Sequence, residues 1–476
     1  MHTIDTIYIN GQFVTSHGSE VMTLQDPVTG ADATHVRLAD ETDARAAIAA
    51  AVAAYDRHRA GTREQRMAWL QRLHDAVLAH ERELVDTMVA EYGGPVATST
   101  GTVRRAANAF ASARRILGSY AFERRIGIAN VVMEPLGVVG LITPWNANYS
   151  FICNKLAMAL AAGSTGVIKP AELSAAQTAL LTRVLHEADL PPGLFNIVTG
   201  RGDTVGAEIT RHPDIAKISF TGSTAVGKTI ARGAVDTMKR VTLELGGKSP
   251  TLLLDDADFA KAIPLAIGAA TMNSGQACLA GTRLLVPAAR LEEAQRMAAQ
   301  AMGALHVGDP RDPATRIGPL VNQRQFERVQ GYIRKGIEEG ATLLAGGEGR
   351  PDGLQQGWFV RPTVFGNVRN DMTIAREEIF GPVLCVIPYR DEDEAIAIAN
   401  DTPYGLHAYV FSGDLARANR VARRVIAGRV FINGLYDEPE APFGGFRQSG
   451  LGREFGIHGF EQYLEPKALM GHEQAL

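Results

Sequence analysis

The chain has 476 residues, of which 46% are hydrophobic, so it is long enough to build two domains around separate cores. Its 48 Lys and Arg residues against 52 Asp and Glu residues give a formal net charge of −4, which excludes the basic surface that nucleic acid or an anionic membrane requires. No apolar run approaches the roughly 18 residues that cross a bilayer, and the N-terminus lacks the features of a secretory leader. We therefore expect a small-molecule ligand, no nucleic acid and no membrane.

The three cysteines are Cys153, Cys278 and Cys385. An odd number at such wide spacing predicts neither a disulfide framework nor a metal site, and it favours a reducing compartment. We expect a cytoplasmic protein without a bound metal.

A hairpin and a set of helices are predicted first along the chain. Asn10-Gly11 stands between two short β-prone runs within residues 7–14, which is a strong hairpin signal. From residue 42 to about residue 118, three segments carry apolar residues at helical spacing, interrupted near Gly61 and at Gly93-Gly94-Pro95. We expect three amphipathic helices that cover a sheet.

A regular alternation of strands and helices follows from residue 137. Strands are predicted at residues 137–142, 165–169, 195–198, 216–220 and 241–244, with helices at 150–162, 174–188 and 225–233 and a short helix to Arg211. Further strands are predicted at 251–254, 282–286, 407–411 and 429–432. This order predicts parallel βαβ units in two α/β domains, with ligands beyond the carboxyl ends of the strands.

Two segments stand outside both alternating regions. Residues 119–138 and the tail 460–469 both read as extended. Left alone, their strand edges would be unpaired, which favours pairing with each other and with another subunit. A hairpin that folds back on its own domain is the alternative.

Two residues have the chemistry of a nucleophile and a base. Cys278 follows the small, flexible run Asn273-Ser-Gly-Gln-Ala, a setting in which a thiol is displayed to a substrate. Glu244 ends the β-like run 240–244 and precedes two glycines, where a carboxylate can act as a general base. Each has an alternative, because a single cysteine is often a buried hydrophobe and a strand-end glutamate is often solvated.

Two other strand ends carry polar groups. Asn146 closes the run Leu141-Ile-Thr-Pro-Trp-Asn, where its amide could stabilise an oxyanion or could cap the next helix. Lys169 and Glu172 follow the next strand, where they could hold a ribose diol or form a surface ion pair. Residues 219–227 place Gly222 and Gly227 around a strand-to-helix turn that favours a pyrophosphate, although the spacing departs from the usual dinucleotide fingerprint.

The joint pattern Glu244-Leu-Gly-Gly-Lys-Ser-Pro and Gly275-Gln-Ala-Cys278 resembles the aldehyde dehydrogenase superfamily, and the resemblance extends over nearly the whole chain. It implies an α/β fold with a Rossmann-like NAD-binding domain, a second α/β catalytic domain and a small β oligomerisation arm. Residues 1–118 and 139–246 would form the NAD-binding domain, 247–450 the catalytic domain, and 119–138 with 451–476 the arm. A homodimer or homotetramer is expected from that arm.

The resemblance also implies a reaction. An aldehyde would be oxidised to the carboxylic acid with NAD+, through a thiohemiacetal and a thioester on Cys278, and Glu244 would be the general base of thioester hydrolysis. Asn146 would hold the oxyanion. NAD is expected rather than NADP, because the Glu172 carboxylate would repel a 2′-phosphate.

The remaining site residues are expected from the resemblance. The cofactor would contact Ile142, Thr143, Pro144, Trp145, Lys169, Glu172, Phe220, Thr221, Gly222, Ser223, Gly227, Leu245, Gly246, Glu378 and Phe380. The substrate would contact Phe151, Asn154, Leu279, Asn433, Tyr436, Asp437 and Phe443. These substrate residues include no arginine for a carboxylate, which favours a medium-sized aromatic or aliphatic aldehyde.

Three other functions remain open. A cysteine hydrolase would share the nucleophile but would want a histidine base, and none of the 12 histidines falls in these motifs. A coenzyme A-acylating dehydrogenase of the same superfamily would have less need of Glu244. A non-catalytic protein of this fold should have lost the thiol.

Overall fold

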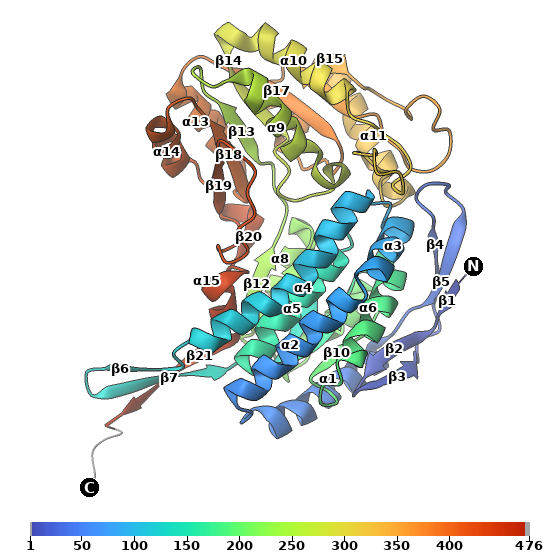
Figure 1. Ribbon diagram of the computed structural model, residues 1–476, viewed down its shortest axis with the longest axis vertical. Helices are drawn as coiled ribbons and strands as arrows, with labels where there is room; N and C mark the ends of the chain where they lie inside the picture. Colours follow the sequence, from blue (N-terminus) through green and yellow to red (C-terminus); the bar gives the residue numbers. More distant parts are fainter. Residues whose placement is uncertain (1, 472–476) are drawn as a thin grey trace.

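The computed structural model describes residues 2–471 and contains two large sheets, each between layers of helices, with a β arm projecting from one end (Figure 1). Residue 1 of the predicted NAD-binding domain and residues 472–476 of the predicted arm lie outside the described residues. Among residues 2–471, no helix combines the length and the apolar character needed to span a bilayer.

The first sheet has the strand order β20-β12-β11-β8-β9-β10-β2-β3. The five strands from β12 to β10 are parallel, and β20 and the β2–β3 hairpin extend the two edges in antiparallel pairing. The bounds are β2 (Thr6–Ile9), β3 (Gln12–Thr15), β8 (Val138–Ile142), β9 (Thr165–Lys169), β10 (Phe195–Ile197), β11 (Ile215–Thr221), β12 (Arg240–Glu244) and β20 (Gly450–Leu451).

Both faces of this sheet are covered because its strands are apolar on both sides. In β8, Val139 and Leu141 pack with one layer of helices, and Val138 and Ile142 pack with the other. The first layer holds α2 (Arg63–Ala79), α3 (Glu81–Tyr92), α4 (Val96–Ser119), α5 (Asn148–Ala162) and α6 (Ala175–Glu187). The second layer holds α1 (Glu41–His58), α7 (Ala207–Arg211) and α8 (Thr224–Val235).

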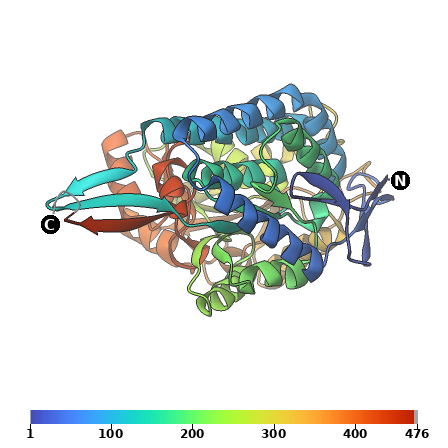
Figure 2. The ribbon, with the colours of Figure 1, turned by 90° about the horizontal axis from the view of Figure 1, so that it is seen from below.

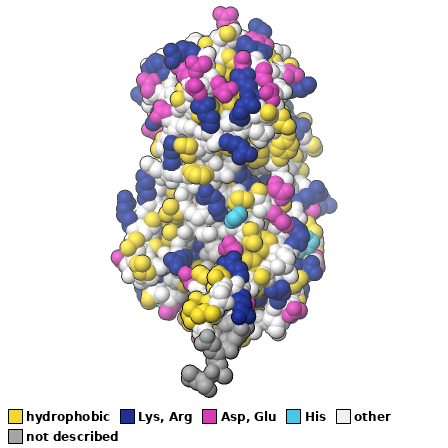
Figure 3. Space-filling view, turned by 90° about the vertical axis from the view of Figure 1, so that its left-hand side faces the viewer, with side chains coloured by type: hydrophobic (Ala, Val, Ile, Leu, Met, Phe, Trp, Pro, Cys, Tyr) yellow, Lys and Arg dark blue, Asp and Glu magenta, His cyan; other side chains and the backbone are white. Residues whose placement is uncertain are grey.

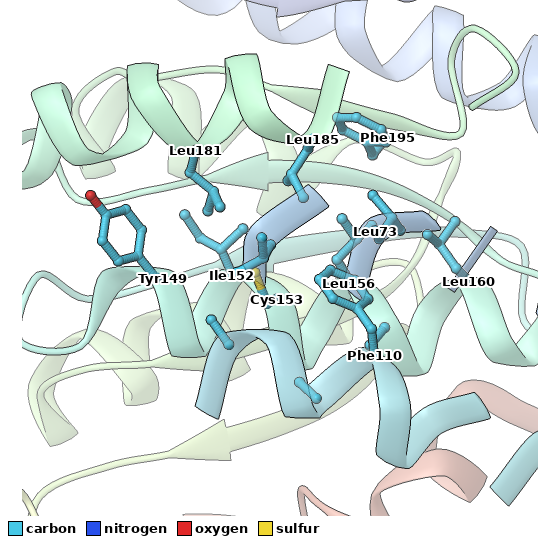
Figure 4. Close-up of a cluster of buried hydrophobic side chains, with 14 of the residues drawn as sticks. Leu73, Phe110, Tyr149, Ile152, Cys153, Leu156, Leu160, Leu181, Leu185 and Phe195 are labelled. Carbon is cyan, nitrogen blue, oxygen red and sulfur yellow. The ribbon is translucent and has the colours of Figure 1, made fainter. Parts of the chain in front are cut away.

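The core between the first layer and the sheet is formed by aliphatic and aromatic side chains from several elements. Figure 4 shows Leu73 of α2, Phe110 of α4, Leu156 of α5, Leu185 of α6 and Phe195 of β10 converging there. The cluster also contains the thiol of Cys153, and burial raises the pKa of that thiol. Cys153 is therefore a core residue and does not compete with Cys278 as nucleophile.

The second sheet has the strand order β15-β16-β17-β14-β13-β18-β19, parallel except for β15. Helices α9 and α10 cover one face, and α11 to α14 cover the other. The bounds are β13 (Pro250–Leu253), α9 (Phe259–Thr271), β14 (Arg283–Pro287), α10 (Leu291–Gly303), α11 (Gln323–Glu338), β15 (Thr342–Ala345), β16 (Thr363–Gly366), α12 (Thr373–Arg376), β17 (Val383–Tyr389), α13 (Glu392–Asn400), β18 (His407–Phe411), α14 (Leu415–Arg424) and β19 (Arg429–Ile432).

The arm is a three-stranded antiparallel sheet of β6 (Glu123–Ile126), β7 (Ala129–Pro135) and β21 (Leu464–Met470). Strands β7 and β21 pair from Leu464 opposite Pro135 to Met470 opposite Ala129. Figures 1 and 2 show this sheet extending away from the body. The predicted pairing of the two extended segments is confirmed.

A smaller sheet of β1 (His2–Ile4), β5 (Asp32–Arg37) and β4 (Val21–Gln25) lies at the N-terminus. The predicted hairpin is β2–β3, and its turn residues Asn10 and Gly11 have φ values of 51° and 79°. Two consecutive positive φ values are the reason for an Asn-Gly turn in a tight hairpin.

Several sequence predictions need correction. Four helices, not three, lie between residues 41 and 119, because the chain breaks at His80 between α2 and α3. The tail begins with α15 (Gly456–Phe460) and a 3₁₀ turn before it becomes extended at Leu464. Strands β4, β5 and β15 to β17 were not predicted. Every predicted strand of the two alternating regions overlaps a strand in the structure.

The proposed division at residues 246 and 247 falls between β12 and β13. The proposed end of the catalytic domain at residue 450 falls within β20, which pairs with β12 of the first sheet. The domain division remains a prediction.

Candidate active site

Four adjacent parallel strands bring the predicted cofactor residues to one edge of the first sheet. Strand β8 ends at Ile142, which is in register with Lys169 of β9 and Phe220 of β11. Thr221 of β11 is in turn in register with Glu244 of β12. The segments 143–146, 169–172, 220–223 and 244–246 therefore leave the sheet side by side, at the edge where α/β proteins bind ligands.

The loop that carries Cys278 has an unusual backbone. Helix α9 ends at Thr271, and Asn273, Ser274 and Gly275 then have φ values of 54°, 58° and 75°. A Cβ at Gly275 would lie 2.2 Å from the carbonyl carbon of Gly381, so this position requires glycine. The turn directs the chain away from the helix just before the thiol.

Gln276 fixes this loop to two other elements. Its Nε2 donates to the Tyr92 hydroxyl at 3.1 Å, and its Oε1 accepts from Val321 N at 3.0 Å. Gln276 is 1% exposed, so these partners satisfy a buried amide. On the far side of the thiol, the Tyr409 hydroxyl donates to Leu279 O at 3.0 Å.

Cys278 is half-buried, and two nearby carboxyl groups act on its thiol. Burial raises the pKa of Cys278, and the charges of Glu378 and Glu244 raise it further. The Cys278 carbonyl lies 2.4 Å from the place that a Cβ on Gly247 would take, which accounts for a glycine there. A thiol in this state needs a base to become a nucleophile.

Glu244 is buried with a free carboxylate. It is 1% exposed, and neither carboxylate oxygen has a hydrogen-bond partner among residues 2–471. Burial raises the pKa of Glu244 well above its ordinary value, and repulsion from Glu454 adds to this. A carboxyl with a raised pKa and a free oxygen is suited to accept a proton from a water or a thiol.

Asn146 is bound to the loop that carries the thiol. Its Nδ2 donates to Gln276 O at 2.8 Å, and its own carbonyl accepts from Asn273 Nδ2 at the same distance. The alternative role as a helix cap is wrong, because α5 begins at Asn148 and Ala147 stands at its cap position without a side-chain bond. The second amide hydrogen of Asn146 remains available to an oxyanion.

Lys169 and Glu172 form an ion pair of 2.9 Å at the end of β9. Lys169 is buried and Glu172 is half-buried, so this is not the freely solvated surface pair that was the alternative. Both groups stand at the strand edge described above.

The glycines of the 220–227 turn have packing reasons of their own. A Cβ at Gly227 would lie 2.4 Å from Leu245 Cδ2, and a Cβ at Gly222 would lie 2.4 Å from Phe220 Cζ. Ser223 caps α8, with its hydroxyl accepting from Val226 N at 3.4 Å. The first turn of α8 begins at the sheet edge, where its N–H groups favour an anion.

Glu378 and Phe380 reach this edge from the second sheet. Glu378 Oε1 accepts from Gly247 N at 3.0 Å, and burial raises the pKa of Glu378 to about 6. Phe380 has a φ of 65°, and its ring meets Trp145 edge-on at 5.5 Å. These contacts bring the 378–380 segment against both the 245–247 and the 143–146 segments.

The predicted substrate residues do not share one environment. Phe151 and Leu279 are half-buried, whereas Phe443 is buried against the rings of His407 and Phe455. Tyr436 and Asp437 are exposed in the loop of residues 433–442, which follows β19.

Two of these residues have other partners. Asn433 Oδ1 accepts from Ser412 N, and its Nδ2 donates to Ser412 O, both at 2.9 Å. Its amide therefore joins the end of β19 to the residue that follows the adjacent strand β18. Asn154 is buried, and its amide is 3.5 Å from Glu454 Oε2. Their assignment to the substrate remains a prediction. The hydrogen bonds above give each residue a role in holding the fold that does not require a substrate.

A buried ionic group behind Glu244 was missed by the sequence reasoning. Glu454 pairs with Lys155 and accepts from Ser219 Oγ at 3.2 Å. All three are buried, and the charges of Glu454 and Lys155 act on the pKa of Glu244 in opposite directions. No local pattern marks Glu454, because its partners are distant in the sequence.

The arrangement combines a thiol, an amide donor and a buried base at the edge of a dinucleotide-type sheet. Among residues 2–471, no group of three or more His, Cys, Asp or Glu side chains could hold a metal ion. The groups present are those of covalent attack on a carbonyl carbon followed by transfer to water.

Comparisons with known proteins agree with this geometry. The model of the aldehyde dehydrogenase family matches residues 13–469. The chain is 44% identical over 468 residues to 3-succinoylsemialdehyde-pyridine dehydrogenase from a Pseudomonas species, which covers 98% of each.

Two solved structures have nearly the same fold. One is a mutant of aldehyde dehydrogenase C from Pseudomonas syringae in complex with NAD+ and octanal, 46% identical with a TM-score of 0.97, covering 98% of this chain and 96% of that chain. The other is an NAD+ complex of aldehyde dehydrogenase from Bacillus cereus, 37% identical with a TM-score of 0.94 and the same coverage.

Proposed function

The chain belongs to the aldehyde dehydrogenase family, and we propose that it oxidises a medium-sized aldehyde to the carboxylic acid with NAD+ at Cys278. The observation that carries this proposal is the juxtaposition of three groups. The Cys278 thiol follows a loop that Asn146 holds, and Glu244 ends strand β12 just before Gly247, which packs against the Cys278 carbonyl.

The strand edge fits NAD+ on the residues present. The Lys169–Glu172 pair offers a cation and an anion to the adenosine ribose, and the first turn of α8 offers N–H groups to a pyrophosphate. Glu378 would hold the second ribose, and Trp145 with Phe380 would pack near the nicotinamide. When bound, NAD+ supplies the acceptor for the hydride that leaves the substrate carbon. The Pseudomonas syringae and Bacillus cereus complexes support this choice.

The first step is attack by the thiolate. Glu244, directly or through a water, takes the proton of Cys278, and the sulfur bonds to the aldehyde carbon. The carbonyl oxygen becomes an oxyanion, which Asn146 Nδ2 and the Cys278 N–H stabilise. One such donor contributes about 2.7–4 kcal/mol to the transition state in comparable sites.

The second half of the reaction releases the acid. After the hydride has left, the acyl group is held as a thioester on Cys278. Once its first proton has passed to solvent, Glu244 removes a proton from the attacking water, and the carbon–sulfur bond breaks with return of that proton to the thiol. The free oxygens of Glu244 are suited to this step because no protein group among residues 2–471 occupies them.

The rival functions are not favoured. A cysteine hydrolase would need a histidine on the thiol, but the buried His407 packs against Phe431 and Phe443, and burial lowers its pKa to about 3. A coenzyme A-acylating enzyme would have less need of the buried Glu244 as a base for water.

The experiment for this proposal uses the purified chain with NAD+ and a panel of aliphatic and aromatic aldehydes that includes octanal. The expected result is NADH and carboxylic acid in equal amounts without added coenzyme A. Acid without NADH, or a requirement for coenzyme A, would overturn it. The panel is chosen because the Pseudomonas syringae structure is a complex with octanal and the Pseudomonas relative is named for a pyridine-bearing semialdehyde.

We also propose that the arm joins two subunits. Ile126, Ile128, Leu469 and Met470 are exposed on it, and its outer strand β6 has no partner on one side among residues 2–471. Light scattering should give a mass at least twice 51.0 kDa, and an active monomer would contradict the assignment. The widely separated free cysteines support a reducing, cytoplasmic location.

A further inference from the structure

Helix α3 ends against the connection between α10 and α11. Gly93, directly after α3, has a φ of 78°, and a Cβ there would lie 2.6 Å from Pro319 Cγ. A Cβ on Gly318 would in turn lie 2.2 Å from the Gly93 carbonyl oxygen. The two glycines therefore allow the end of α3 to pack closely against residues 318–321. This contact fixes the place of Tyr92, the last residue of α3.

The loop before the thiol is held from both of these elements. Ser274 Oγ accepts from Gly318 N at 3.0 Å, and Gln276 Oε1 accepts from Val321 N at 3.0 Å. Gln276 Nε2 donates to the Tyr92 hydroxyl at 3.1 Å. Gln276 and Tyr92 are each 1% exposed, so removal of that hydroxyl would leave a buried amide donor without its partner.

The main chain of Gln276 leads to the oxyanion donor. Its carbonyl accepts from Asn146 Nδ2 at 2.8 Å and from Asn273 Nδ2 at 3.3 Å. The bond from Asn146 uses one of the two hydrogens on its Nδ2 and thereby sets the direction of the other, which is the one available to an oxyanion. The position of Gln276 therefore determines where the second hydrogen of Asn146 points.

The ring of Tyr92 contacts the segment that carries Asn146. It lies 5.9 Å from the ring of Trp145, at an interplanar angle of 45°, and Trp145 directly precedes Asn146 in the chain. Tyr92 thus contacts the segment of the oxyanion donor through its ring and the loop of the thiol through its hydroxyl. Replacement by phenylalanine separates the two contacts, because it keeps the ring and removes only the hydroxyl.

Resting on the proposed function, we propose that Tyr92 is a positioning residue for the oxidation of the aldehyde. Its hydroxyl holds Gln276, and Gln276 in turn aims the Asn146 amide at the oxyanion that forms when the thiolate attacks. A hydrogen-bond donor stabilises such an oxygen only when it is already in place, and small displacements of catalytic groups lower the rate strongly. Tyr92 itself touches neither the substrate nor the cofactor in this scheme.

The test compares Tyr92→Phe with the wild type on one aldehyde and NAD+. The single-turnover rate of NADH formation should fall about tenfold, because the oxyanion donor is misaligned. Alkylation of Cys278 by iodoacetamide forms no oxyanion, so its rate and its pH dependence should be unchanged. The Kd of NAD+ should stay within about twofold of the wild type. A loss confined to the single-turnover rate separates the positioning of Asn146 from a general disturbance of the loop.

A double-mutant cycle tests the route through Asn146. In Asn146→Ala the side-chain donor is already absent, so the addition of Tyr92→Phe should lower the single-turnover rate by less than a further twofold. Full additivity of the two substitutions would show that Tyr92 does not act through Asn146 and would overturn the proposal.

Tyr149→Phe is the matched control. Tyr149, labelled in Figure 4, is a fully buried tyrosine of α5 in the same helical layer, and its hydroxyl donates to Leu84 O at 3.2 Å. Its variant also loses one buried hydrogen bond, so it should melt at a lower temperature with unchanged rates. Gln276→Met removes the bond to Tyr92 from the other end, and it should give the same separation of rates if Tyr92→Phe does not fold.

Two results with Tyr92→Phe would contradict the proposal. One is an unchanged single-turnover rate, and the other is an equal loss of the single-turnover and alkylation rates. Absence of NADH from every aldehyde with the wild type would overturn the proposed function instead.

Discussion

The loop around Cys278 and the 433–442 loop differ in how the rest of the molecule holds them. Around the thiol, Gln276 is bonded to Tyr92 and Val321, and Tyr409 holds the Leu279 carbonyl. The 433–442 loop is mostly exposed, and Tyr436 is 64% exposed. One loop is held by buried hydrogen bonds, whereas the other is anchored chiefly near its ends.

This difference separates chemistry from selection. Attack on a carbonyl needs the sulfur and its oxyanion donors fixed to within a fraction of an ångström, which buried, satisfied hydrogen bonds provide. Selection among aldehydes needs a surface that can change without loss of the catalytic geometry.

Figure 3 shows acidic and basic side chains interspersed over the face that it presents, without one dominant charge. We expect substitutions at the first loop to abolish turnover and substitutions at the second to alter preference.

The largest effect is expected at the thiol. Cys278→Ala should abolish NADH formation from every aldehyde, because no covalent intermediate can form. NAD+ binding, measured by calorimetry, should remain within about twofold of the wild type, since the thiol is not among the groups proposed to hold the cofactor. Cys153→Ala is the matched control, because Cys153 belongs to the core. Turnover by Cys278→Ala above a trace would refute the mechanism.

The next largest effect is expected at Glu244. Burial raises the pKa of Glu244 well above its ordinary value of 4.5, so the base form appears only as pH rises through that raised pKa. Thioester hydrolysis should therefore increase with pH over the same range. Glu244→Gln should give a burst of NADH equal to the enzyme concentration, followed by steady-state turnover reduced about 100-fold and without this pH limb. Stopped-flow absorbance separates the two phases. The burst requires that the Cys278 proton can pass to water when Glu244 is replaced, and equal loss of both phases would show that thiol activation depends on Glu244 as much as hydrolysis does.

Elements with a signal among neighbouring residues were predicted from the sequence, and elements without such a local signal were missed. The strand that precedes Asn146 and the strands that end at Lys169 and Glu244 were predicted because alternation and strand ends are local patterns. Strand β17 was missed because Pro388 lies within its apolar run, where a proline argues against a strand. The break at His80 has no local signal, since no glycine or proline stands there.

The site residues, too, were predictable only where the signal is local in the sequence. Cys278 and Glu244 stand in distinctive short motifs, whereas the partner of Glu454, Lys155, lies 299 residues away in the sequence. The Glu454–Lys155 pair does not follow from periodicity. Its recognition required the folded chain.

A moderate effect is expected at Glu172, which is neither as enclosed as the thiol loop nor as open as the 433–442 loop. The wild type should prefer NAD+ to NADP+, because the Glu172 carboxylate would face a 2′-phosphate. Glu172→Ser should narrow the ratio of kcat/KM values about tenfold, which corresponds to about 1.4 kcal/mol. Because Lys169 would lose its partner at 2.9 Å, Lys169→Met provides the control for loss of the pair. Equal use of both cofactors by the wild type would show that Glu172 points away from the ribose.

The smallest effect is expected at Tyr436, and it tests the open side of the comparison. Its ring is exposed, and its hydroxyl lies 3.5 Å from the Asn433 carbonyl, so Tyr436→Ala removes little buried surface. Substitutions at such positions usually change free energies by about 0.5 kcal/mol or less, which predicts a roughly twofold change in KM for octanal with kcat unchanged. Phe443→Ala, at 6% exposure, is the contrasting variant. It removes a buried ring, which costs about 3–5 kcal/mol of stability in comparable cores, so its melting temperature should fall. If Tyr436→Ala instead lowered kcat more than tenfold, the exposed loop would take part in chemistry, and the separation between the two loops would fail.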